Sequence, residues 1–352
     1  MENHPYIHWQ PNIAELFSPI QEELKTASSI YILTDENVGQ IWLNTLLENC
    51  PILQHANVIE VPAGEEAKEW EILNQVLTQL MEDKADKKSW LINIGGGVIT
   101  DLGGLVASLY KRGISFIHIP TSLMGMIDAS VGGKNGINFC GSKNMIGTFQ
   151  EPDALLLYPG FLDTLPEKEI LSGFAEMIKH ALIADESLWE AIVDLEEIDA
   201  KHLKPFIRRN IQIKNHIVFD DPFEEDKRKL LNYGHTFAHA YEAWSMAQQK
   251  DFSHGYCVAQ GMKLANFIAV KLKILDTEIG QEINEFLEEI FPIHPLPALD
   301  ELMGYLSQDK KREGSILNYT LLETIGKAKY NHPITLIDWQ GYYQEWRGHY
   351  TH

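Results

Sequence analysis

The first part of the chain alternates short apolar runs with helical patterns. Between several of the runs, apolar residues recur at helical spacing, as over 70–81 and 102–110. Strands that are apolar on both faces and are separated by helices are typical of a parallel sheet covered on both sides. The pattern therefore predicts a doubly wound α/β domain over residues 1–165. The apolar runs are bounded by Gly, Pro, Asp or Asn and lie at 29–33, 58–61, 90–94, 116–120 and 154–157.

After residue 165 the pattern becomes helical. Pro166, followed by acidic residues, predicts the start of a helix that continues to Ile183. Only 316–323 resembles a strand in this part. A chain of 352 residues also exceeds the size at which single cores usually stop growing, so we expect two domains, the second mainly α-helical over 166–352. Further helices are predicted over 203–219, 227–244, 257–273 and 281–290.

The charge balance narrows the class of partner. With 45% hydrophobic and 22% charged residues, the chain has the composition of a folded globular protein. Its 29 basic and 50 acidic residues give a net charge of -21, which argues against nucleic acid or an anionic membrane as a partner. There is no apolar run of about 18 residues and no basic, then apolar leader, so we expect a cytoplasmic protein.

The cysteines do not indicate a disulfide or a zinc-thiolate site. Cys50, Cys140 and Cys257 lie far apart, and no CxxC pair occurs. We expect three reduced and buried thiols.

A glycine cluster with an acid, GGGVITD at 95–101, follows the predicted strand over 90–94. Residues without a Cβ allow backbone amides at a helix start to approach phosphate oxygens closely. The cluster is not GxGxxG, because Thr100 stands where the third glycine would fall, and a glycine turn by itself is often a packing feature. Asp101, Thr121 and Ser122 favour a ligand, because ligands of open α/β sheets bind at the carboxyl ends of strands. The cluster predicts a Rossmann-like dinucleotide site.

Three distant segments each supply a potential metal ligand. Glu176 lies in GFAEMIK, His235 in NYGHTFAHA and His254 in SHGYCVAQGM. One carboxylate and two imidazoles can hold a divalent cation and leave coordination positions open for a substrate. His239 lies four residues after His235 and shares its helix face, so both can be ligands, or one can be a ligand and the other an acid or base.

Cations gather around these motifs although the chain is acidic. A lysine on a helix is usually a solvated surface residue. The concentration of lysines and arginines here instead predicts an anionic small-molecule substrate that carries phosphate and carboxylate groups. The cations in question are Lys134, Lys143, Lys179, Lys214 and Arg228.

Taken together, these segments resemble the 3-dehydroquinate synthase family of the sugar-phosphate cyclase superfamily. The resemblance runs from about residue 35 to residue 326, with the motifs in the expected order. The matching segments are GGGVITDLGGLVA, KRGISFIHIPTSLMGMIDASVGGKNGIN, SKNMIG, TLPEKEILSGFAEMIKHALI, LLNYGHTFAHAYE and HGYCVAQGM.

The resemblance implies an NAD- and metal-dependent lyase of the shikimate pathway. In that family, 3-deoxy-D-arabino-heptulosonate 7-phosphate is transiently oxidised, loses phosphate, is reduced again and closes by an intramolecular aldol step to 3-dehydroquinate. The family's zinc or cobalt ligands map onto Glu176, His235 and His254, the three residues that the motifs already indicated.

The resemblance also assigns substrate contacts. His239 would relay the proton of the hydroxyl that is oxidised, while Lys214 and Arg228 would hold the carboxylate. Asp128 and Lys179 would contact hydroxyls near the metal. Phosphate or hydroxyl groups would be contacted by Lys134, Asn144, Asn232 and one lysine of the DKK run, Lys310 or Lys311. Arg112 resembles an arginine that a neighbouring subunit lends, which implies a homodimer.

On the NAD side, the resemblance places the contacts in the first domain. Lys134 and Lys143, which flank a glycine-rich loop, are also candidates there. The remaining candidates are Asp35 and Asn37 for the adenosine end, Glu65 and Lys68 for the ribose, Gly95, Gly96, Gly97, Val98 and Asp101 for the pyrophosphate and nicotinamide side, and Thr121, Ser122, Phe161 and Thr164 for closing the site.

Three alternatives remain at this point. A related cyclase acting on a different sugar phosphate shares the metal and NAD motifs but replaces the carboxylate and phosphate contacts. A glycerol-dehydrogenase-like, metal-dependent alcohol dehydrogenase also carries GGGxxxD and a helical second domain, but it has no reason to keep so many phosphate-binding lysines. A non-catalytic protein with this fold would be expected to have lost at least one ligand or acid/base residue.

Overall fold

The structure, a computed structural model, describes residues 6–140, 142–250, 252–306, 312–313 and 315–350. The chain divides into two units, one up to Pro166 and one from Glu167 onward. This division lies one residue from the boundary expected from the sequence. The NAD-binding role of the first domain and the metal-binding role of the second stay predictions. Lys310 and Lys311, the candidate substrate contacts of the DKK run, lie outside the described residues.

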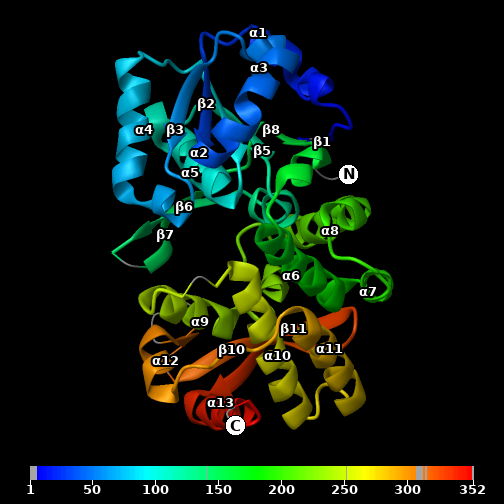
Figure 1. Cartoon of the computed structure of the whole chain (residues 1–352). Helices are drawn as coiled ribbons and strands as arrows, with labels where there is room; N and C mark the ends of the chain where they lie inside the picture. The colour runs from blue at the N-terminus through cyan, green and yellow to red at the C-terminus, as the bar shows by residue number, and fades with distance from the viewer. Residues whose placement is uncertain (1–5, 141, 251, 307–311, 314, 351–352) are drawn as a thin grey trace. The chain divides into compact units, whose positions relative to one another are not determined.

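The first unit is built on a six-stranded parallel sheet, which confirms the predicted doubly wound α/β class (Figure 1). The strand order is β1-β8-β5-β4-β2-β3. The strands are β1 (Ile7–Trp9), β2 (Ile30–Asp35), β3 (Asn57–Val61), β4 (Trp90–Gly95), β5 (Ser115–Pro120) and β8 (Ala154–Leu157). The helices are α1 (Gln21–Lys25), α2 (Glu36–Val38), α3 (Asn44–Asn49), α4 (Trp70–Glu82) and α5 (Gly97–Leu109).

The core of this unit forms on both faces of the sheet. Tyr31, Ile32 and Leu33 are successive residues of β2, and all three are buried. Successive strand residues point to opposite faces, so each face must be covered. On one face, α4 and α5 pack against the sheet, for example through Leu73 and Leu105.

Three strands of the first unit were not predicted. β1 has only three residues and pairs with β8 at the edge of the sheet. The other two, β6 (Lys134–Phe139) and β7 (Ser142–Phe149), form an antiparallel hairpin. Glycine and lysine interrupt the apolar pattern of this hairpin, so neither strand carries the continuous run by which the parallel strands were found.

The second unit is mainly helical, as predicted. Its small sheet pairs β10 (Ile316–Thr324), which was predicted, with β11 (Lys327–Thr335), which was not. β11 is rich in polar residues and contains Pro333, so its pattern did not indicate a strand. The other elements are α6 (Glu167–Ala184), α7 (Glu186–Val193), α8 (Ala200–Asp220), the 3-10 helix η9 (Lys227–Asn232), α9 (His235–Ala247), α10 (His254–Lys271), α11 (Thr277–Ile290), α12 (Leu299–Leu306), α13 (Leu336–Gly348) and β9 (Arg312–Glu313).

The single helix predicted over 227–244 is wrong. The chain forms η9, turns at Tyr233 and Gly234, and starts α9 at His235. Gly234 has a left-handed backbone with φ of 79°, which ends the first helical segment. One glycine costs a helix only about 1 kcal/mol relative to alanine, so the sequence pattern could not show the break.

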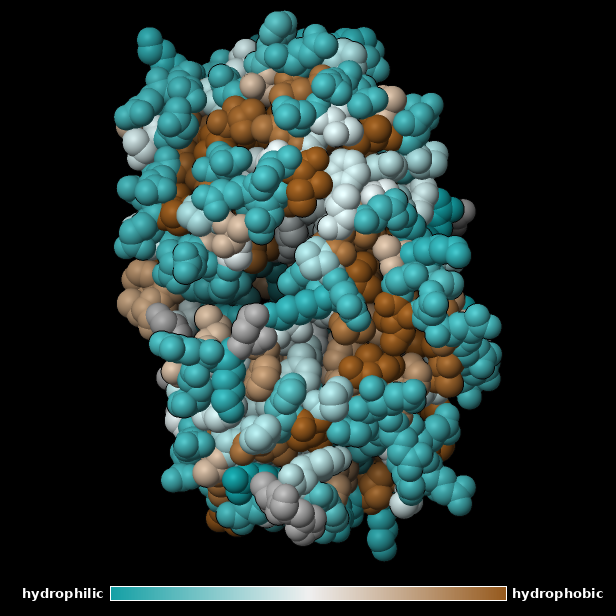
Figure 2. Space-filling view, viewed as in Figure 1, coloured by the Kyte–Doolittle hydropathy of each residue, from teal (hydrophilic) through white to brown (hydrophobic). Residues whose placement is uncertain are grey.

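The surface and the cysteines bear on two expectations from the sequence, a charged surface without membrane spans and buried thiols. Much of the face in Figure 2 is hydrophilic, in keeping with the charged composition. None of the helices formed by the described residues is long and apolar enough to cross a membrane. Cys50 and Cys257 are buried thiols outside any disulfide of the described residues, but Cys140 is exposed at the end of the β6–β7 hairpin, so the expectation of three buried thiols is wrong for Cys140.

His118 predicts the acid sensitivity of the first unit. It is buried in β5, and burial lowers its pKa to about 3, although a hydrogen bond with Asn135 acts in the opposite direction. The unfolded chain therefore binds the proton more readily, and stability is lost as the pH falls from about 6.5 towards 3, by at most about 1.4 kcal/mol per pH unit. Urea unfolding at pH 7, 6, 5 and 4 should show a weaker pH dependence in His118→Gln. Parallel curves for the two proteins would contradict this assignment.

Candidate active site

Three side chains meet in the second unit. Glu176 is fully buried in the middle of α6, while His235 and His254 are the first residues of α9 and α10. One ligand atom from each lies within 4.8 Å of the others. Oε1 of Glu176 lies 3.4 Å from Nε2 of His235 and 3.4 Å from Nε2 of His254. Residues from three separate helices thus form one cluster with the donor set that a divalent cation prefers.

Close packing at glycines brings these helices together. A Cβ on Gly255 would lie 2.1 Å from the carbonyl oxygen of Ser172, so α10 can approach α6 only with glycine at this position. The amide of Gly255 also donates to the hydroxyl of Ser172 over 3.1 Å. A Cβ on Gly261 would lie 1.9 Å from the carbonyl oxygen of Gly234, just before α9. His254 and His235 are next to these contacts, which therefore set the size of the cluster.

The second nitrogen of each imidazole has its own partner. Nδ1 of His235 lies 3.0 Å from the carbonyl oxygen of Tyr233, and Nδ1 of His254 lies 3.3 Å from Oε2 of Glu242. A carbonyl or carboxylate at Nδ1 favours the tautomer with its proton there, so both Nε2 lone pairs face Glu176. Glu242 was not predicted. Its position seven residues after His235, on the same face of α9, is the signal that could have found it.

The electrostatics of the cluster suit a bound cation. Lys179, one turn after Glu176 and buried, forms an ion pair with its carboxylate. Burial and the charge of Lys179 lower the pKa of His235. Burial also acts to lower the pKa of His254, but the carboxylates of Glu242 and Glu176 outweigh it and raise this pKa to about 10. The carboxylates thus attract positive charge to this point, where a dication can take the place of a proton.

The other predicted residues of this unit lie on the neighbouring helices. Lys214 is buried on α8, which packs against η9, and η9 carries Arg228 and Asn232. The amide of Arg228 donates to Asp221 over 3.0 Å, and the side-chain amide of Asn232 donates to Glu224 over 2.6 Å. Two acids thus hold the segment that carries these predicted contacts.

His239 lies one turn after His235 on α9 and is exposed. Its ring centroid is 5.4 Å from that of His235 and 6.4 Å from that of His254. It therefore borders the cluster on the solvent side, while Glu176, the central residue, is fully buried.

In the first unit, predicted residues gather at the carboxyl ends of three adjacent strands. Asp35 ends β2 and accepts hydrogen bonds from the amides of Asn37 and Val38, each over 3.0 Å. Gly95 ends β4, and its carbonyl accepts from the amide of Thr121, which follows β5, over 2.9 Å. The chain reverses its direction of winding between β2 and β4. Such a switch point is where open α/β sheets bind ligands.

The glycine turn itself leads directly into α5. The helix begins at Gly97 without a side-chain cap. A Cβ on Gly96 would lie 3.3 Å from the hydroxyl oxygen of Ser122, so the turn fits closely against the segment after β5. Val98 lies in the first turn of α5, and Asp101 lies one turn further on. Backbone amides at such a helix start can receive a phosphate.

A second group ties the hairpin to this region. Lys68 is buried, contacts Asp101 over 2.6 Å, and donates a hydrogen bond to the side chain of Asn144. Glu65 accepts from Asn138 over 2.8 Å and lies 3.9 Å from the ammonium group of Lys143. Glu65 and Lys68, the predicted ribose contacts, therefore lie beside Lys143 and Asn144 of the hairpin.

The remaining predicted residues of the first unit are more scattered. The ring centroids of Trp42 and Phe161 lie 4.9 Å apart. The indole N–H of Trp42 donates a hydrogen bond to the hydroxyl of Thr164 over 2.9 Å. Asp128 is half-buried in the short π-helix η7 (Gly125–Ala129) that follows β5, and Lys134 is exposed at the start of β6. Arg112 does not join the carboxyl-end group, because it follows α5 and lies near the amino end of β5.

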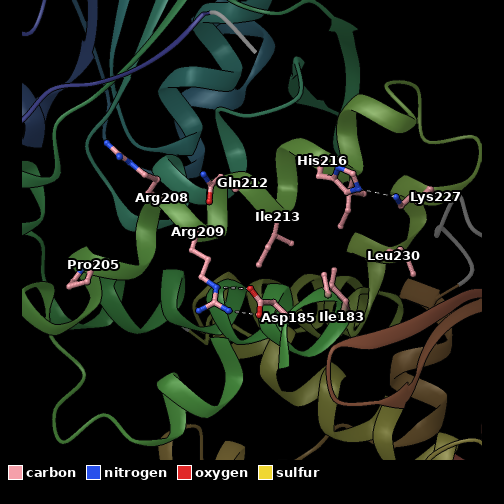
Figure 3. A pocket seen from close by; sticks show the side chains of 12 residues that line it. Ile183, Asp185, Pro205, Arg208, Arg209, Gln212, Ile213, His216, Lys227 and Leu230 are labelled. Carbon is pink, nitrogen blue, oxygen red and sulfur yellow. Dashed lines mark hydrogen bonds and ion pairs between the residues drawn. The ribbon is translucent and has the colours of Figure 1, made fainter. Parts of the chain in front are cut away.

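A separate groove of about 690 Å³ lies along α8 in the second unit (Figure 3). Its apolar residues include Ile183, Ile213 and Leu230, and Figure 2 shows hydrophobic side chains gathered over the region of α6 and α8. At one end, Arg209 forms an ion pair with Asp185 over 2.5 Å. Among the residues that the structure describes, no site residue predicted from the sequence lines this groove, so the groove does not mark the candidate site.

The two units match models of a known protein family. The family model described as 3-dehydroquinate synthase N-terminal matches residues 58–172, and the one described as 3-dehydroquinate synthase C-terminal matches residues 173–312. A 3-dehydroquinate synthase from Parabacteroides distasonis is 36% identical over 327 residues, which cover 91% of this chain and 92% of that protein. The chain belongs to the 3-dehydroquinate synthase family. The resemblance found in the motifs is therefore confirmed.

Solved structures of two other cyclases share the fold. A 2-epi-5-epi-valiolone synthase from Streptomyces hygroscopicus, with NAD+ and Zn2+ bound, has a TM-score of 0.82 and 25% identity over 98% of this chain and 97% of that one. A 2-deoxy-scyllo-inosose synthase, complexed with carbaglucose-6-phosphate, NAD+ and Co2+, has a TM-score of 0.82 and 22% identity over 96% of each chain. The higher identity to the 3-dehydroquinate synthase from Parabacteroides distasonis favours that family over these rival cyclases.

The glycine contact between α6 and α10 is testable in this member of the 3-dehydroquinate synthase family. Gly255→Ala should lower the free energy of unfolding by about 1–3 kcal/mol, because the added methyl group pushes the helices apart. Gly341→Ala is the matched control, since Gly341 lies in α13 and no heavy atom of the described residues lies within 4 Å of the added Cβ. The control should gain up to about 1 kcal/mol from helix propensity. Urea unfolding followed by circular dichroism measures both, and equal stability of the two variants would contradict the packing argument.

Proposed function

We propose that this chain converts 3-deoxy-D-arabino-heptulosonate 7-phosphate into 3-dehydroquinate and phosphate, with NAD and one divalent cation, zinc or cobalt. The observation that carries the proposal is the buried cluster of Glu176, His235 and His254, in a chain whose two halves match the 3-dehydroquinate synthase models. When bound, NAD accepts a hydride from the substrate alcohol and later returns it, and the cation polarises the alcohol oxygen.

The two histidines and Glu176 would hold the cation, through Nε2 of each ring and the carboxylate. The outer partners of the rings support this role, because a fixed tautomer presents a lone pair rather than a proton. His239, exposed beside the cluster, takes the proton of the substrate hydroxyl and passes it to solvent. Lys179 contacts a hydroxyl of the substrate and balances the charge of Glu176.

The charged groups of the substrate meet the cations of the chain. Lys214 and Arg228 hold the carboxylate, since a guanidinium can donate two parallel hydrogen bonds to it. Burial of both side chains strengthens such a contact, because little water competes for it. Asp128 contacts a hydroxyl. Phosphate and further hydroxyl groups are bound by Lys134, Asn144, Asn232 and a lysine at position 310 or 311.

The first unit binds NAD at the carboxyl ends of β2, β4 and β5. The amides at the start of α5 receive the pyrophosphate, and Asp35 with Asn37 takes the adenosine end. Glu65 and Lys68, together with Asp101, contact the ribose and nicotinamide side. Contributions from Lys143, Thr121, Ser122, Phe161 and Thr164 complete the site.

A homodimer in the cytoplasm belongs to the same proposal. Arg112 is exposed and lies near the amino end of β5, away from the strand ends that carry the NAD contacts of its own unit. Its position is suited to a contact with a second copy of the chain, and such a contact would supply one cation to the neighbouring substrate site.

The direct test is phosphate release from 3-deoxy-D-arabino-heptulosonate 7-phosphate by the purified protein with catalytic NAD. We expect phosphate release without net NADH. Release should stop on chelation and return with zinc or cobalt. Steady NADH formation from simple alcohols, without phosphate release, would instead identify an alcohol dehydrogenase.

Replacement of Glu176 tests the metal site. Glu176→Gln keeps the shape of the side chain but removes its charge, leaving two imidazoles as strong ligands, so metal binding and phosphate release should both fall by at least about 100-fold. NAD binding, measured by fluorescence titration, should persist because the proposed NAD residues lie in the first unit. Glu190→Gln, an exposed position on α7, is the control and should match the original protein. Full activity of Glu176→Gln with bound metal would refute the ligand assignment.

Replacement of Arg228 tests the carboxylate contact. Arg228→Lys keeps the charge but loses the planar fork, and we expect KM to rise about 10- to 100-fold, the loss of about 1.5–3 kcal/mol of charge-assisted binding. Metal affinity should not change. Lys227→Ala removes the adjacent cation, which pairs with Asp220 at the surface, and should leave KM within about twofold. Steady-state kinetics measures both variants, and an unchanged KM in Arg228→Lys would remove Arg228 from the substrate site.

A further inference from the structure

The two residues before His235 form a turn with a defined geometry. Tyr233 has φ and ψ of -55° and 126°, and Gly234 has 79° and -22°. These are the angles of a type II turn, in which the central peptide is rotated by about 180° relative to type I. This rotation decides where the carbonyl of Tyr233 points. In the structure, its oxygen lies 3.0 Å from Nδ1 of His235.

The side chain of Tyr233 anchors the turn in the second unit. Its ring is fully buried, and its hydroxyl donates to Oδ1 of Asn266 on α10 over 2.5 Å. The amide of Asn266, which is also fully buried, donates to Oδ1 of Asn284 on α11 over 2.9 Å. Asn284 in turn donates to the carbonyl of Lys263 over 3.3 Å. The turn is therefore joined by polar contacts to two helices, neither of which carries His235.

The backbone of α10 encloses the same turn from another side. A Cβ on Gly234 would lie 2.9 Å from the amide nitrogen of Met262 and 3.0 Å from the carbonyl oxygen of Val258. There is thus no room for a larger residue at Gly234, and little room for the central peptide to rotate. The hydroxyl of Tyr233 and the packing at Gly234 restrain opposite ends of the same peptide group.

We propose that Tyr233, held by Asn266, is a positioning residue of the metal centre. The residue touches neither substrate nor cation. It directs its own backbone carbonyl to Nδ1 of His235, which keeps the proton on that nitrogen and leaves Nε2 to face Glu176. The proposal rests on the proposed metal-binding function. No other step of the proposed mechanism uses this buried tyrosine.

The test removes one oxygen atom. Tyr233→Phe keeps the ring in place but frees the turn from Asn266, and we expect the Kd for cobalt to rise about tenfold, the lower end of the range for outer partners of metal-bound histidines. The affinity is measured in the metal-stripped, full-length protein by competition with a chromogenic chelator. The visible absorption spectrum of the cobalt-loaded protein reports the ligand geometry, and its bands should shift or broaden in the variant.

Tyr343→Phe is the matched control. Tyr343 is also fully buried in the second unit, and its hydroxyl donates to the carbonyl of Pro297 over 2.8 Å, without a contact to either histidine among the described contacts. Both variants lose one buried hydrogen bond, so both should lose about 1 kcal/mol of stability. Only Tyr233→Phe should lose metal affinity.

The outcomes separate this inference from the proposed function. A cobalt Kd and spectrum of Tyr233→Phe that match those of the original protein would overturn the positioning role, while the metal centre would stand. An equal loss of affinity in Tyr343→Phe would also overturn it, because the effect would then come from general loosening. Failure of the original protein to bind cobalt or zinc would refute the proposed metal site itself.

Discussion

The burial of one carboxylate, that of Glu176, is the constraint on which the second unit depends. Moving an ionised carboxylate out of water costs several kcal/mol unless opposite charge or hydrogen bonds compensate. Lys179, His235 and His254 supply that compensation, and each must come close. The glycine contacts between α6, α9 and α10 allow this approach. Without these contacts the charge at the centre of the unit would lack partners, and the cluster would lose its shape.

The candidate ligand site of the first unit is built differently from the charged cluster of the second unit. This site relies on backbone amides at the end of β4 and the start of α5, and the buried ammonium group of Lys68 beside it is paired with Asp101. Side chains such as Lys68 and Asp101 pair with each other and hold the hairpin in place. The family match spans both units.

Many of the strands and helices were predicted from local sequence patterns, but several elements were missed. The parallel strands were predicted because burial on both faces leaves continuous apolar runs. The hairpin β6–β7 and strand β11 were missed because glycine, lysine and proline interrupt their patterns. Glu224 accepts a hydrogen bond from Asn232, which no sequence pattern indicated. Such a contact depends on the loop between α8 and η9, which no periodicity describes.

The sequence by itself determined the class of each unit, the family, and the residue types that can bind a cation and a nucleotide, because these depend on composition and on short motifs. Only the tertiary structure decided that Glu176, His235 and His254 lie close enough together to hold one cation, that Glu242 and Tyr233 contact the outer nitrogens of the two histidines, and that a turn separates η9 from α9. The physical reason is that these contacts join residues up to 78 positions apart along the chain (176 to 254), and their distances are set by helix packing.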